Sequence, residues 1–564
     1  MRKSIIIALL FLAQHFVIAQ KTILIDGKFD DWNDITPVFV DNSGDGQSNG
    51  IDFKRIWAFN DESNLYFRFE LTKEINLQEN NDLAIYLDYD SDINTGFKIN
   101  GIGAEIRFFF GERFGVIEED DDMEFVNFVP IGMLVAPTVS SDQFEVLFSR
   151  QINESGINFS ANPTISFRLE DNGFNGDEAP DDLTGIQYQL DQSNKAEIPE
   201  ASLERPISTD FRLLTYNIEV DHLFDPSRKA AFRRIFQALQ PDIIAFQEIR
   251  NFSSSDTKDI VEEFLPGQTW HHKKHGFDIV TVSKYPINFS ESVDGNAAFY
   301  IDIDGQEVLL INCHLPCCDN NDDRQDEVDI IMEYIRELKN GNSSHNVEEG
   351  TPIIIAGDMN FVGDSNQPNT FRTGDIFSNG FYGPDFDPDW DDTELVDADH
   401  YATNSFGNFT WLNFNGQFNP GKLDWIFYTD SKLAIENTFA LYPPGLSSEL
   451  QEEYNLEVGD AFLASDHLPV IADFSYSIVS VNDFVPLDIS VYPNPVIDNL
   501  LVDSKELRLK TIKILNKLGQ TLISKNASND SINSINVSDL ESGSYFILLE
   551  TEEGRIAKPF LKVK

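Results

Sequence analysis

The sequence predicts an α/β protein whose central part has two packed β-sheets with helices outside, between two all-β modules. The first observation is length, because 564 residues are too many for a single hydrophobic core. The second is that residues 211–476 contain many short apolar strands but only two clear amphipathic helices. The third is that the segments before and after this part show strand patterns without helices. We therefore expect an α/β domain with a β-sandwich on each side of it in the chain.

The N-terminus has the features of a signal peptide, which we place at residues 1–19. Arg2 and Lys3 precede an apolar run that begins at Ser4, and small residues around Ala19 suit a cleavage site. The run is too short to span a bilayer, and no later stretch is long and apolar enough to be a transmembrane helix. The sequence thus predicts an exported protein with no membrane span.

The formal net charge of −54 limits the kinds of partner. Removal of the signal peptide would take away Arg2 and Lys3 and leave −56. Such a surface repels phosphate polymers at long range, which argues against a protein that coats nucleic acid. A phosphate substrate is not excluded, because ambient salt and a divalent metal in the site both weaken the repulsion.

Only three cysteines occur, at Cys313, Cys317 and Cys318. An exported protein with so few is not a disulfide scaffold. Cys313 lies in an apolar strand and is expected in the core. For Cys317 and Cys318 the sequence leaves open a vicinal disulfide, an exposed thiol pair and a transition-metal site.

Residues 20–199 are predicted to form the first β-sandwich, because short β-branched and aromatic runs alternate with Asn, Gly and Asp clusters. The stretch Ile25-Asp26-Gly27-Lys28-Phe29-Asp30-Asp31-Trp32, with the later Asn-Leu-Tyr-Phe strand, resembles the opening of secreted carbohydrate-binding-like sandwich domains. That resemblance implies a glycan as a partner. The alternative is that this module only packs on the central domain.

One turn of this module carries alternating oxygen side chains. Asp88, Asp90, Asp92 and Asn94 stand two residues apart between a strand and Gly96. Such a spacing can wrap a Ca²⁺ ion, although the closing bidentate Glu of a helical calcium loop is absent. A solvated acidic hairpin turn is the alternative.

A polar connector at residues 200–208 leads to the central domain, residues 209–477. Helices are expected at 226–239 and 325–338. Strands are expected at 212–217, 242–248, 279–283, 308–314, 353–360, 423–427 and 468–474.

Polar residues stand at or beside the ends of these strands. They are Asn217, Glu248, His314, Asp358 with Asn360, Asp424, and Ser465-Asp466-His467. Any one of them alone is ordinary, since a His or Asp after an apolar strand is often only a hydrogen-bonded loop residue. Six such points in one domain predict a polar site at one edge of the sheets.

The strings that carry these residues resemble the endonuclease/exonuclease/phosphatase family. They are Leu214-Thr215-Tyr216-Asn217, Phe246-Gln247-Glu248, Val282-Ser283-Lys284-Tyr285-Pro286-Ile287, Ile311-Asn312-Cys313-His314-Leu315, Gly357-Asp358-Met359-Asn360, Leu423-Asp424-Trp425-Ile426-Phe427 and Ser465-Asp466-His467-Leu468-Pro469. The resemblance covers the whole domain. It implies a four-layered α/β sandwich and metal-dependent cleavage of phosphoester bonds.

Chemistry and resemblance give these residues the same roles. Glu248, with Asn217 and Asp466, would hold Mg²⁺ or Mn²⁺, since hard cations take carboxylate and amide oxygens. His467 would activate the attacking water, with Asp424 orienting its ring. His314 would donate a proton or hydrogen bond to the phosphate or leaving group. Asp358 and Asn360 would position the phosphate, the water or a second ion.

The family pattern includes a second carboxylate that orients the histidine matching His314, and the sequence does not settle which residue this is. Asp278 is a candidate. Substrate contacts are expected from Arg324 in the acidic loop after His314, and from Trp390 and Trp411 in the long aromatic stretch 361–412.

After a connector at 478–487, residues 488–564 are predicted to form a small β-sandwich. Its Tyr492-Pro493-Asn494-Pro495 start, its Gly543-Ser544-Tyr545 strand and its Lys562-Val563-Lys564 end resemble the C-terminal sorting domain of type IX secretion. The resemblance implies the type IX secretion machinery as a partner and a secreted or cell-surface location.

The sequence as a whole thus predicts an exported, metal-dependent phosphodiesterase, with an extracellular nuclease as the first hypothesis. A phospholipid or sugar-phosphate phosphoesterase is the alternative within the same family. The alternative from another class is a non-catalytic, glycan-binding surface protein. The presence of Glu248, Asp466 and His467 argues against it.

Overall fold

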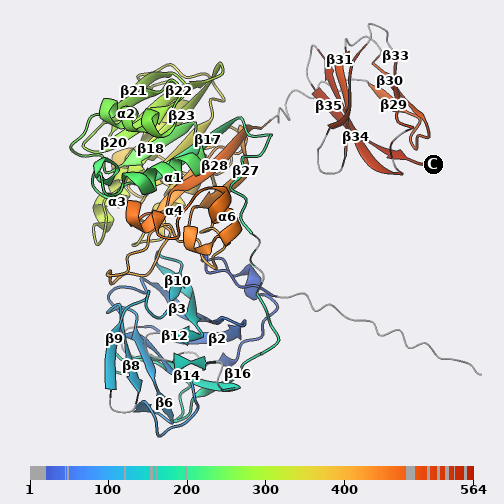
Figure 1. Cartoon of the computed structure of the whole chain (residues 1–564). Helices are drawn as coiled ribbons and strands as arrows, with labels where there is room; N and C mark the ends of the chain where they lie inside the picture. The colour runs from blue at the N-terminus through green and yellow to red at the C-terminus, as the bar shows by residue number, and fades with distance from the viewer. Residues whose placement is uncertain are drawn as a thin grey trace, which may run out of the picture. The chain divides into compact units, whose positions relative to one another are not determined.

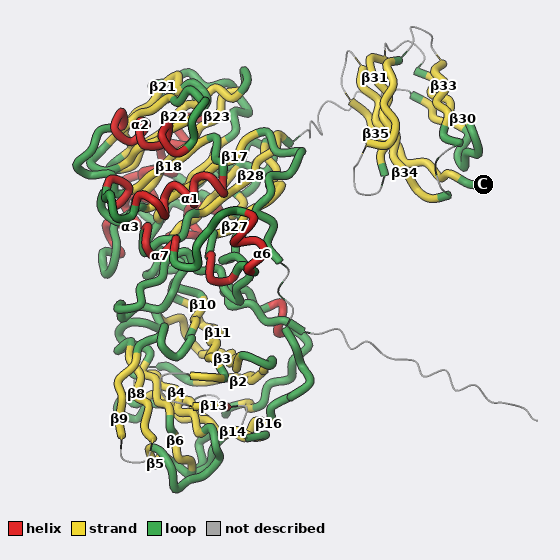
Figure 2. Tube along the Cα trace, viewed as in Figure 1, coloured by secondary structure: helices red, strands yellow, loops and turns green. Residues whose placement is uncertain are grey.

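The computed structural model describes residues 21–477, apart from gaps within 43–49, 120–121, 153–156, 160–161 and 197–199. It also describes residues 489–564, apart from gaps within 505–508, 517–520, 528–531, 539–541 and 552–554. The expected signal peptide and the whole 478–487 connector lie outside these residues. The chain divides into two compact units, Met1–Ser477 and Ile478–Lys564. Figure 1 shows the order of the elements, and Figure 2 shows how few of them are helices.

The first β-sandwich is built from two sheets whose strand orders are β1-β2-β3-β11-β10 and β15-β14-β4-β7-β8-β9, with β16 also paired to β14. The strands are β1 (Phe39–Val40), β2 (Phe53–Asn60), β3 (Asn64–Ile75), β4 (Leu83–Asp88), β7 (Ile106–Phe109), β8 (Phe114–Glu119), β9 (Asp122–Val126), β10 (Leu134–Ala136), β11 (Ser141–Ser149), β14 (Thr164–Asp171), β15 (Glu178–Ala179) and β16 (Ile186–Gln189). Two short hairpins, β5 (Phe97–Ile99) with β6 (Ile102–Ala104) and β12 (Gln151–Ile152) with β13 (Ile157–Asn158), complete it. Phenylalanines fill the space between the sheets: the rings of Phe67 on β3 and Phe167 on β14 are 4.8 Å apart.

The central domain has two six-stranded sheets of mixed direction. Their orders are β19-β20-β18-β17-β28-β27 and β21-β22-β23-β24-β26-β25. The strands are β17 (Phe211–Asn217), β18 (Ile243–Gln247), β19 (His271–His275), β20 (Ile279–Ser283), β21 (Ile287–Val293), β22 (Asn296–Ile303), β23 (Gln306–His314), β24 (Ile353–Asp358), β25 (Val396–Asp397), β26 (Asp424–Tyr428), β27 (Leu433–Ala440) and β28 (Val470–Tyr476). The helices are α1 (Lys229–Leu239), α2 (Ser254–Phe264), α3 (Asn321–Lys339), α4 (Asn366–Thr373), α5 (Asn379–Tyr382), α6 (Ser448–Glu453) and α7 (Asp460–Ala464).

Three buried clusters show how these elements pack. One joins the two sheets, for example Leu213 of β17 with Phe299 of β22 and Leu310 of β23. A second packs α1 and α2 on the first sheet, and a third packs α3 on the second sheet. These contacts support a sandwich-type α/β arrangement. The two expected helices correspond to α1 and α3, whereas the short helices α4 to α7 and the 11-residue helix α2 were not predicted. Its sequence is polar, and it begins at a capping box formed by Ser253 and Asp256.

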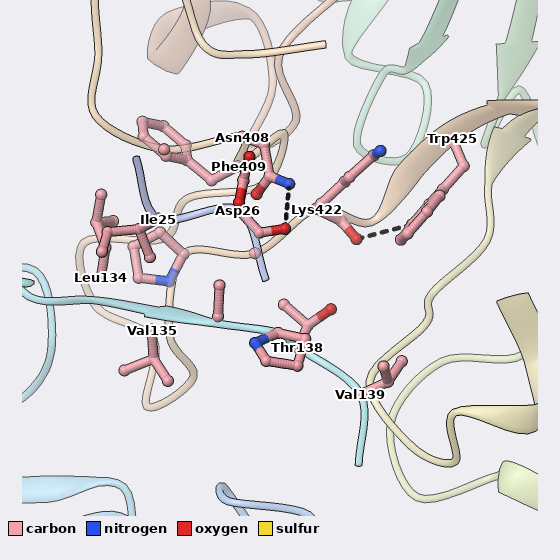
Figure 3. A pocket seen from close by; sticks show the side chains of 15 residues that line it. Ile25, Asp26, Leu134, Val135, Thr138, Val139, Asn408, Phe409, Lys422 and Trp425 are labelled. Atoms are coloured by element: carbon pink, nitrogen blue, oxygen red, sulfur yellow. Dashed lines mark hydrogen bonds between the residues drawn. The ribbon is translucent and has the colours of Figure 1, made fainter. Parts of the chain in front are cut away.

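The first sandwich packs directly on loops of the central domain. Ser140 N donates to Gly363 O at 2.8 Å, and Ile25 N donates to Phe406 O at 2.6 Å. The side chain of Asn419 accepts a hydrogen bond from Val135 N at 2.9 Å and donates one to Val135 O at 2.8 Å. A small cavity of about 50 Å³ remains at this contact (Figure 3). Its lining includes Ile25, Leu134, Val135, Phe409, Lys422 and Trp425. These contacts are extensive enough for the first sandwich to position loops of the central domain.

The C-terminal module has a three-stranded sheet, β29-β30-β33, and a four-stranded sheet, β32-β31-β34-β35. The strands are β29 (Ser490–Tyr492), β30 (Asn499–Asp503), β31 (Leu509–Leu515), β32 (Thr521–Asn526), β33 (Ile532–Asn536), β34 (Gly543–Thr551) and β35 (Arg555–Lys562). Its core includes Val502, Ile514 and Ile547, from both sheets. Among the residues that the structure describes, no helix is both long enough and apolar enough to cross a membrane.

Candidate active site at the strand ends

The pairing of the strands brings the predicted polar residues together. In the second sheet β23 and β24 run parallel, so that His314 stands opposite Asp358. Strand β26 pairs with β24 on its other side and sets Asp424 opposite Asp358 as well. In the first sheet, the parallel strands β17 and β18 end side by side at Asn217 and Gln247. Glu248 follows directly, with a left-handed φ of +63° that ends the strand.

Asn217 connects the two sheets at this edge. Its Nδ2 donates to Asp358 Oδ2 at 2.9 Å and to Glu248 Oε1 at 3.4 Å. Its Oδ1 accepts from Glu219 N at 3.0 Å, and its backbone oxygen accepts from Ser465 Oγ at 2.8 Å. Because Asn217 is only 1% exposed, these bonds fix the distance between the two carboxylates.

The segment Ser465-Asp466-His467 supplies one histidine–carboxylate pair. His467 Nδ1 lies 2.8 Å from Asp424 Oδ2, and both residues are buried. The other ring nitrogen, Nε2, lies 3.7 Å from Asp358 Oδ2. Burial alone would lower the pKa of His467, but the neighbouring carboxylates of Asp424 and Asp358 outweigh it and raise that pKa to about 10. Burial raises the pKa of Asp424.

His314 forms a second pair, and its partner is Asp278. His314 Nδ1 lies 2.8 Å from Asp278 Oδ2, while Nε2 lies 3.6 Å from Asp358 Oδ2 and 3.8 Å from Glu248 Oε1. Burial disfavours the charged ring, but the hydrogen bond to Asp278 and the nearby carboxylates raise the pKa of His314. The structure therefore supplies the orienting carboxylate that the sequence did not settle.

Replacing Asp278 by Asn is expected to lower kcat by about 10- to 100-fold, because an amide can point His314 but cannot stabilise its charged form. The KM should change much less, since Asp278 orients His314 and does not face the substrate directly. Steady-state kinetics on wild type and Asp278→Asn measure the changes in kcat and KM separately. Asp259→Asn, an exposed residue of α2, is the matched control and should behave as wild type; equal kcat values in Asp278→Asn and the control would contradict the role.

These residues line a cavity of about 540 Å³. Glu248, His314, Asp358, Asn360, Asp466 and His467 all contribute to its wall. So do Gln78 and Thr138 of the first sandwich, which sequence reasoning missed. Gln78 Oε1 accepts from Asn419 N at 2.9 Å, and Thr138 Oγ1 donates to Phe361 O at 2.9 Å. The first sandwich thus forms part of the wall of the candidate active site.

The three residues expected to contact substrate have different positions. Trp411 lines the cavity and donates from Nε1 to Asp466 Oδ2 at 2.9 Å. Arg324 is fully buried, and its guanidinium binds the backbone oxygens of Pro316 and Cys318. It therefore shapes the loop and does not face the cavity, contrary to expectation. Trp390 donates to Thr351 O at 2.7 Å and is likewise absent from the cavity wall.

Cys317 and Cys318 also line the cavity and are free thiols, 2.7 Å apart at sulfur. Burial, together with the neighbouring thiol of Cys318, raises the pKa of Cys317 to about 11. The Cys317 thiol is therefore protonated at neutral pH when no metal is bound. Cys313 is buried in the core, as expected.

The donor atoms at this edge suit a hard divalent cation. Glu248, Asp358 and Asp466 offer carboxylate oxygens and Asn360 an amide oxygen. Donor atoms of Asp358, Asp424 and His467 lie within 4.8 Å of one another. Since Asp424 and His467 already bind each other, the carboxylates outside this pair are the better candidates for holding an ion.

Two histidine–carboxylate pairs converge on a shared carboxylate at the edge of two packed sheets, an arrangement that offers both a proton acceptor and a proton donor for hydrolysis. Comparison with known families agrees. A model described as "Endonuclease/Exonuclease/phosphatase family" matches residues 214–467, and one described as "Secretion system C-terminal sorting domain" matches residues 490–563. Residues 214–467 are therefore a hydrolase domain of the endonuclease/exonuclease/phosphatase family, and the chain ends in a secretion sorting domain.

Similar folds occur among solved structures. The human Nocturnin catalytic domain with bound sulfate is 15% identical, over 49% of this chain and 97% of that one, with a TM-score of 0.31. A truncated TDP2 from Caenorhabditis elegans is 16% identical over 47% and 97%, with a TM-score of 0.31. An endonuclease/exonuclease/phosphatase family protein from Leptotrichia buccalis is 14% identical over 47% and 99%, also with a TM-score of 0.31. No curated protein matches the chain.

The sorting domain has a direct consequence for location. It indicates type IX secretion to the cell surface or the extracellular space. The candidate active site therefore works outside the cytoplasm.

Proposed function

We propose that this protein is a metal-dependent phosphoesterase that hydrolyses phosphodiester bonds, and that its substrate is extracellular nucleic acid, which it cleaves as an endonuclease. The observation that carries the proposal is the convergence of two oriented histidines on one carboxylate. His314 Nε2 and His467 Nε2 lie 3.6 and 3.7 Å from Asp358 Oδ2, inside the 540 Å³ cavity. One base and one acid on opposite sides of a phosphate are what in-line phosphoester hydrolysis needs.

Glu248, Asn217 and Asp466 would hold Mg²⁺ or Mn²⁺. When bound, such an ion polarises a phosphate oxygen and lowers the pKa of water. His467 would take the proton from the attacking water at Nε2 in its neutral form, while Asp424 holds Nδ1–H and stabilises the charged ring. A cation held by Glu248 and Asp466 would favour the neutral form, because its charge offsets the carboxylates that raise the pKa of His467. His314 donates from its Nε2 to the phosphate or the leaving oxygen, with Asp278 in the orienting role. Asp358 and Asn360 position the phosphate between the two histidines.

There is one alternative substrate class for the same site. A phospholipid or sugar phosphate is favoured by the net charge of −54, which repels a polyanion. Nucleic acid is favoured by Trp411, whose half-buried ring at the cavity wall offers a surface for a base. A purely glycan-binding role is not supported, since both histidine–carboxylate pairs are complete.

A substrate panel tests the proposal on the mature chain. Duplex DNA, RNA, sphingomyelin and a phosphomonoester are each incubated with Mg²⁺, Mn²⁺ or EDTA. Metal-dependent nicking of DNA or RNA supports the nuclease. Hydrolysis of lipid or monoester alone would replace it with the rival substrate class, and no hydrolysis of any substrate would contradict the enzymatic proposal itself.

Trp411 and Trp390 provide a matched pair of variants. Trp411→Ala is expected to raise the KM for nucleic acid about tenfold or more, because it removes a ring from the cavity wall and a donor from Asp466. Trp411→Phe, which keeps a ring, should recover part of this loss. Trp390→Ala should leave KM unchanged, because Trp390 packs against Lys339 and Thr351 away from the cavity. Equal KM values in Trp411→Ala and Trp390→Ala would contradict this assignment.

A further inference from the structure

A second acidic cluster lies within the first sandwich and plays no part in the proposed hydrolysis. Asp88 ends β4, Asp90 follows in the next loop, and Glu105 joins β6 to β7. One carboxylate oxygen of each lies within 4.8 Å of those of the other two. Residues that are 17 apart in the chain thus meet at one point.

The two end members of this cluster are buried, and the backbone orients them. Asp88 and Glu105 are each 2% exposed. Asp88 Oδ2 accepts from Gly103 N at 3.3 Å, and Glu105 Oε2 accepts from Tyr89 N at 3.1 Å. The other oxygen of each, Asp88 Oδ1 and Glu105 Oε1, is buried without a hydrogen-bond partner. Each carboxylate is therefore fixed through one oxygen and has the other free for a ligand.

No cationic side chain neutralises the cluster. Among the described residues, no Lys, Arg or His forms an ion pair with Asp88, Asp90 or Glu105. Buried carboxylates this close together are unfavourable when ionised unless a cation lies between them.

We propose that Asp88, Asp90 and Glu105 bind a calcium ion. The donors are all oxygen, with no His or Cys in the cluster, which favours a hard cation over zinc or copper. Ca²⁺ accepts many protein oxygens in irregular geometry, whereas Mg²⁺ keeps most of its water and suits exposed sites. The export of the chain places this site where Ca²⁺ is abundant.

The proposed calcium ligands differ from the set Asp88, Asp90, Asp92 and Asn94 that the spacing in the sequence suggests. Ser91 has a left-handed φ of +57°, which ends the alternation of side chains after Asp90. Asp92 and Asn94 are exposed, and Asp92 Oδ1 accepts from Asn94 N and Nδ2 at 3.0 and 2.8 Å. These two residues stabilise their own turn, and Glu105 takes their place in the cluster.

Calorimetric titration of chelator-treated mature protein with CaCl2 tests this site, with Glu105→Gln as the variant and Asp92→Asn as the control. Each variant removes one negative charge from the same region. We expect wild type and Asp92→Asn to bind one more calcium ion than Glu105→Gln does. Equal calcium binding by wild type and Glu105→Gln, or loss of the site in Asp92→Asn, would overturn the proposal.

A second measurement holds even if Glu105→Gln does not fold. In the Glu248→Gln background, which impairs the candidate active site, 10 mM Ca²⁺ should raise Tm by about 1–2 °C over 10 mM Mg²⁺, given a millimolar Kd. Identical Tm values in the two salts would overturn the calcium site. This readout is independent of hydrolysis, so its failure leaves the proposed phosphoesterase untouched.

Discussion

Replacement of His467 by Ala is expected to lower kcat by about 10³-fold or more. His467 is the only residue of the proposed mechanism that accepts a proton, and general base catalysis contributes about 10²- to 10⁴-fold. Its ring is buried and held 2.8 Å from Asp424. Single-turnover kinetics with a nucleic-acid substrate measure the chemical step directly.

His345→Ala is the matched control for this variant. His345 lies beside Glu307, 3.1 Å away, on the rim of the second sheet and outside the cavity. Its removal should change kcat less than twofold. A His467→Ala protein that is folded and retains a tenth or more of wild-type kcat would exclude His467 as the base. The kcat of Asp424→Asn should lie between those of His467→Ala and His345→Ala, because this change keeps the geometry of the pair and removes only the charge.

A buried ion pair between Arg212 and Asp473 is expected to contribute strongly to stability. Asp473→Asn is expected to lower the free energy of unfolding by about 3–5 kcal/mol, because it leaves a buried guanidinium without its counter-charge. Arg212 Nε and Nη2 donate to the two oxygens of Asp473, each at 2.7 Å, and Asp473 is fully buried. Arg212 also donates to Leu239 O at 2.8 Å, so the pair joins β17, β28 and the end of α1. Chemical denaturation of the mature protein gives the value.

The exposed pair Arg372–Glu394 serves as its control. Both side chains are about half exposed, and Glu394→Gln should change the free energy of unfolding by less than about 1 kcal/mol. The double variant Arg212→Met with Asp473→Leu should recover most of the loss, since no unpaired charge remains buried. A loss below about 1 kcal/mol in Asp473→Asn would show that water or another group compensates Arg212.

Much of the candidate site was predictable because its residues follow apolar strands. Asn217, His314 and Asp358 each end a buried run, and parallel pairing brings such ends to one edge. The partner of His314 was harder to assign. Asp278 precedes β20, and only the antiparallel pairing of β20 with β18 brings it toward His314. That register is not visible in local sequence.

Other expectations failed for physical reasons that also lie outside local sequence. Arg324 stands in a run of acidic and amide residues that suggests a solvated loop, yet the chain folds back so that its guanidinium satisfies backbone oxygens. Gln78 was missed because the contact with Asn419 joins residues 341 apart in two different modules. Ser91 has a left-handed φ that ends the alternation of side chains, so the carboxylates that lie close together are those of Asp88, Asp90 and Glu105, without Asp92.

We propose that carboxylate and amide oxygens at the strand ends hold a divalent cation for phosphodiester hydrolysis. Hydrolysis of bis(4-nitrophenyl) phosphate by the mature protein tests it most directly, after EDTA treatment and then with Mn²⁺ or Mg²⁺ added in steps. We expect EDTA to abolish the activity and added metal to restore it. We also expect Glu248→Gln to need at least about tenfold more metal for half-maximal rate. Activity that survives EDTA, or an unchanged metal requirement in Glu248→Gln, would contradict the proposed metal site.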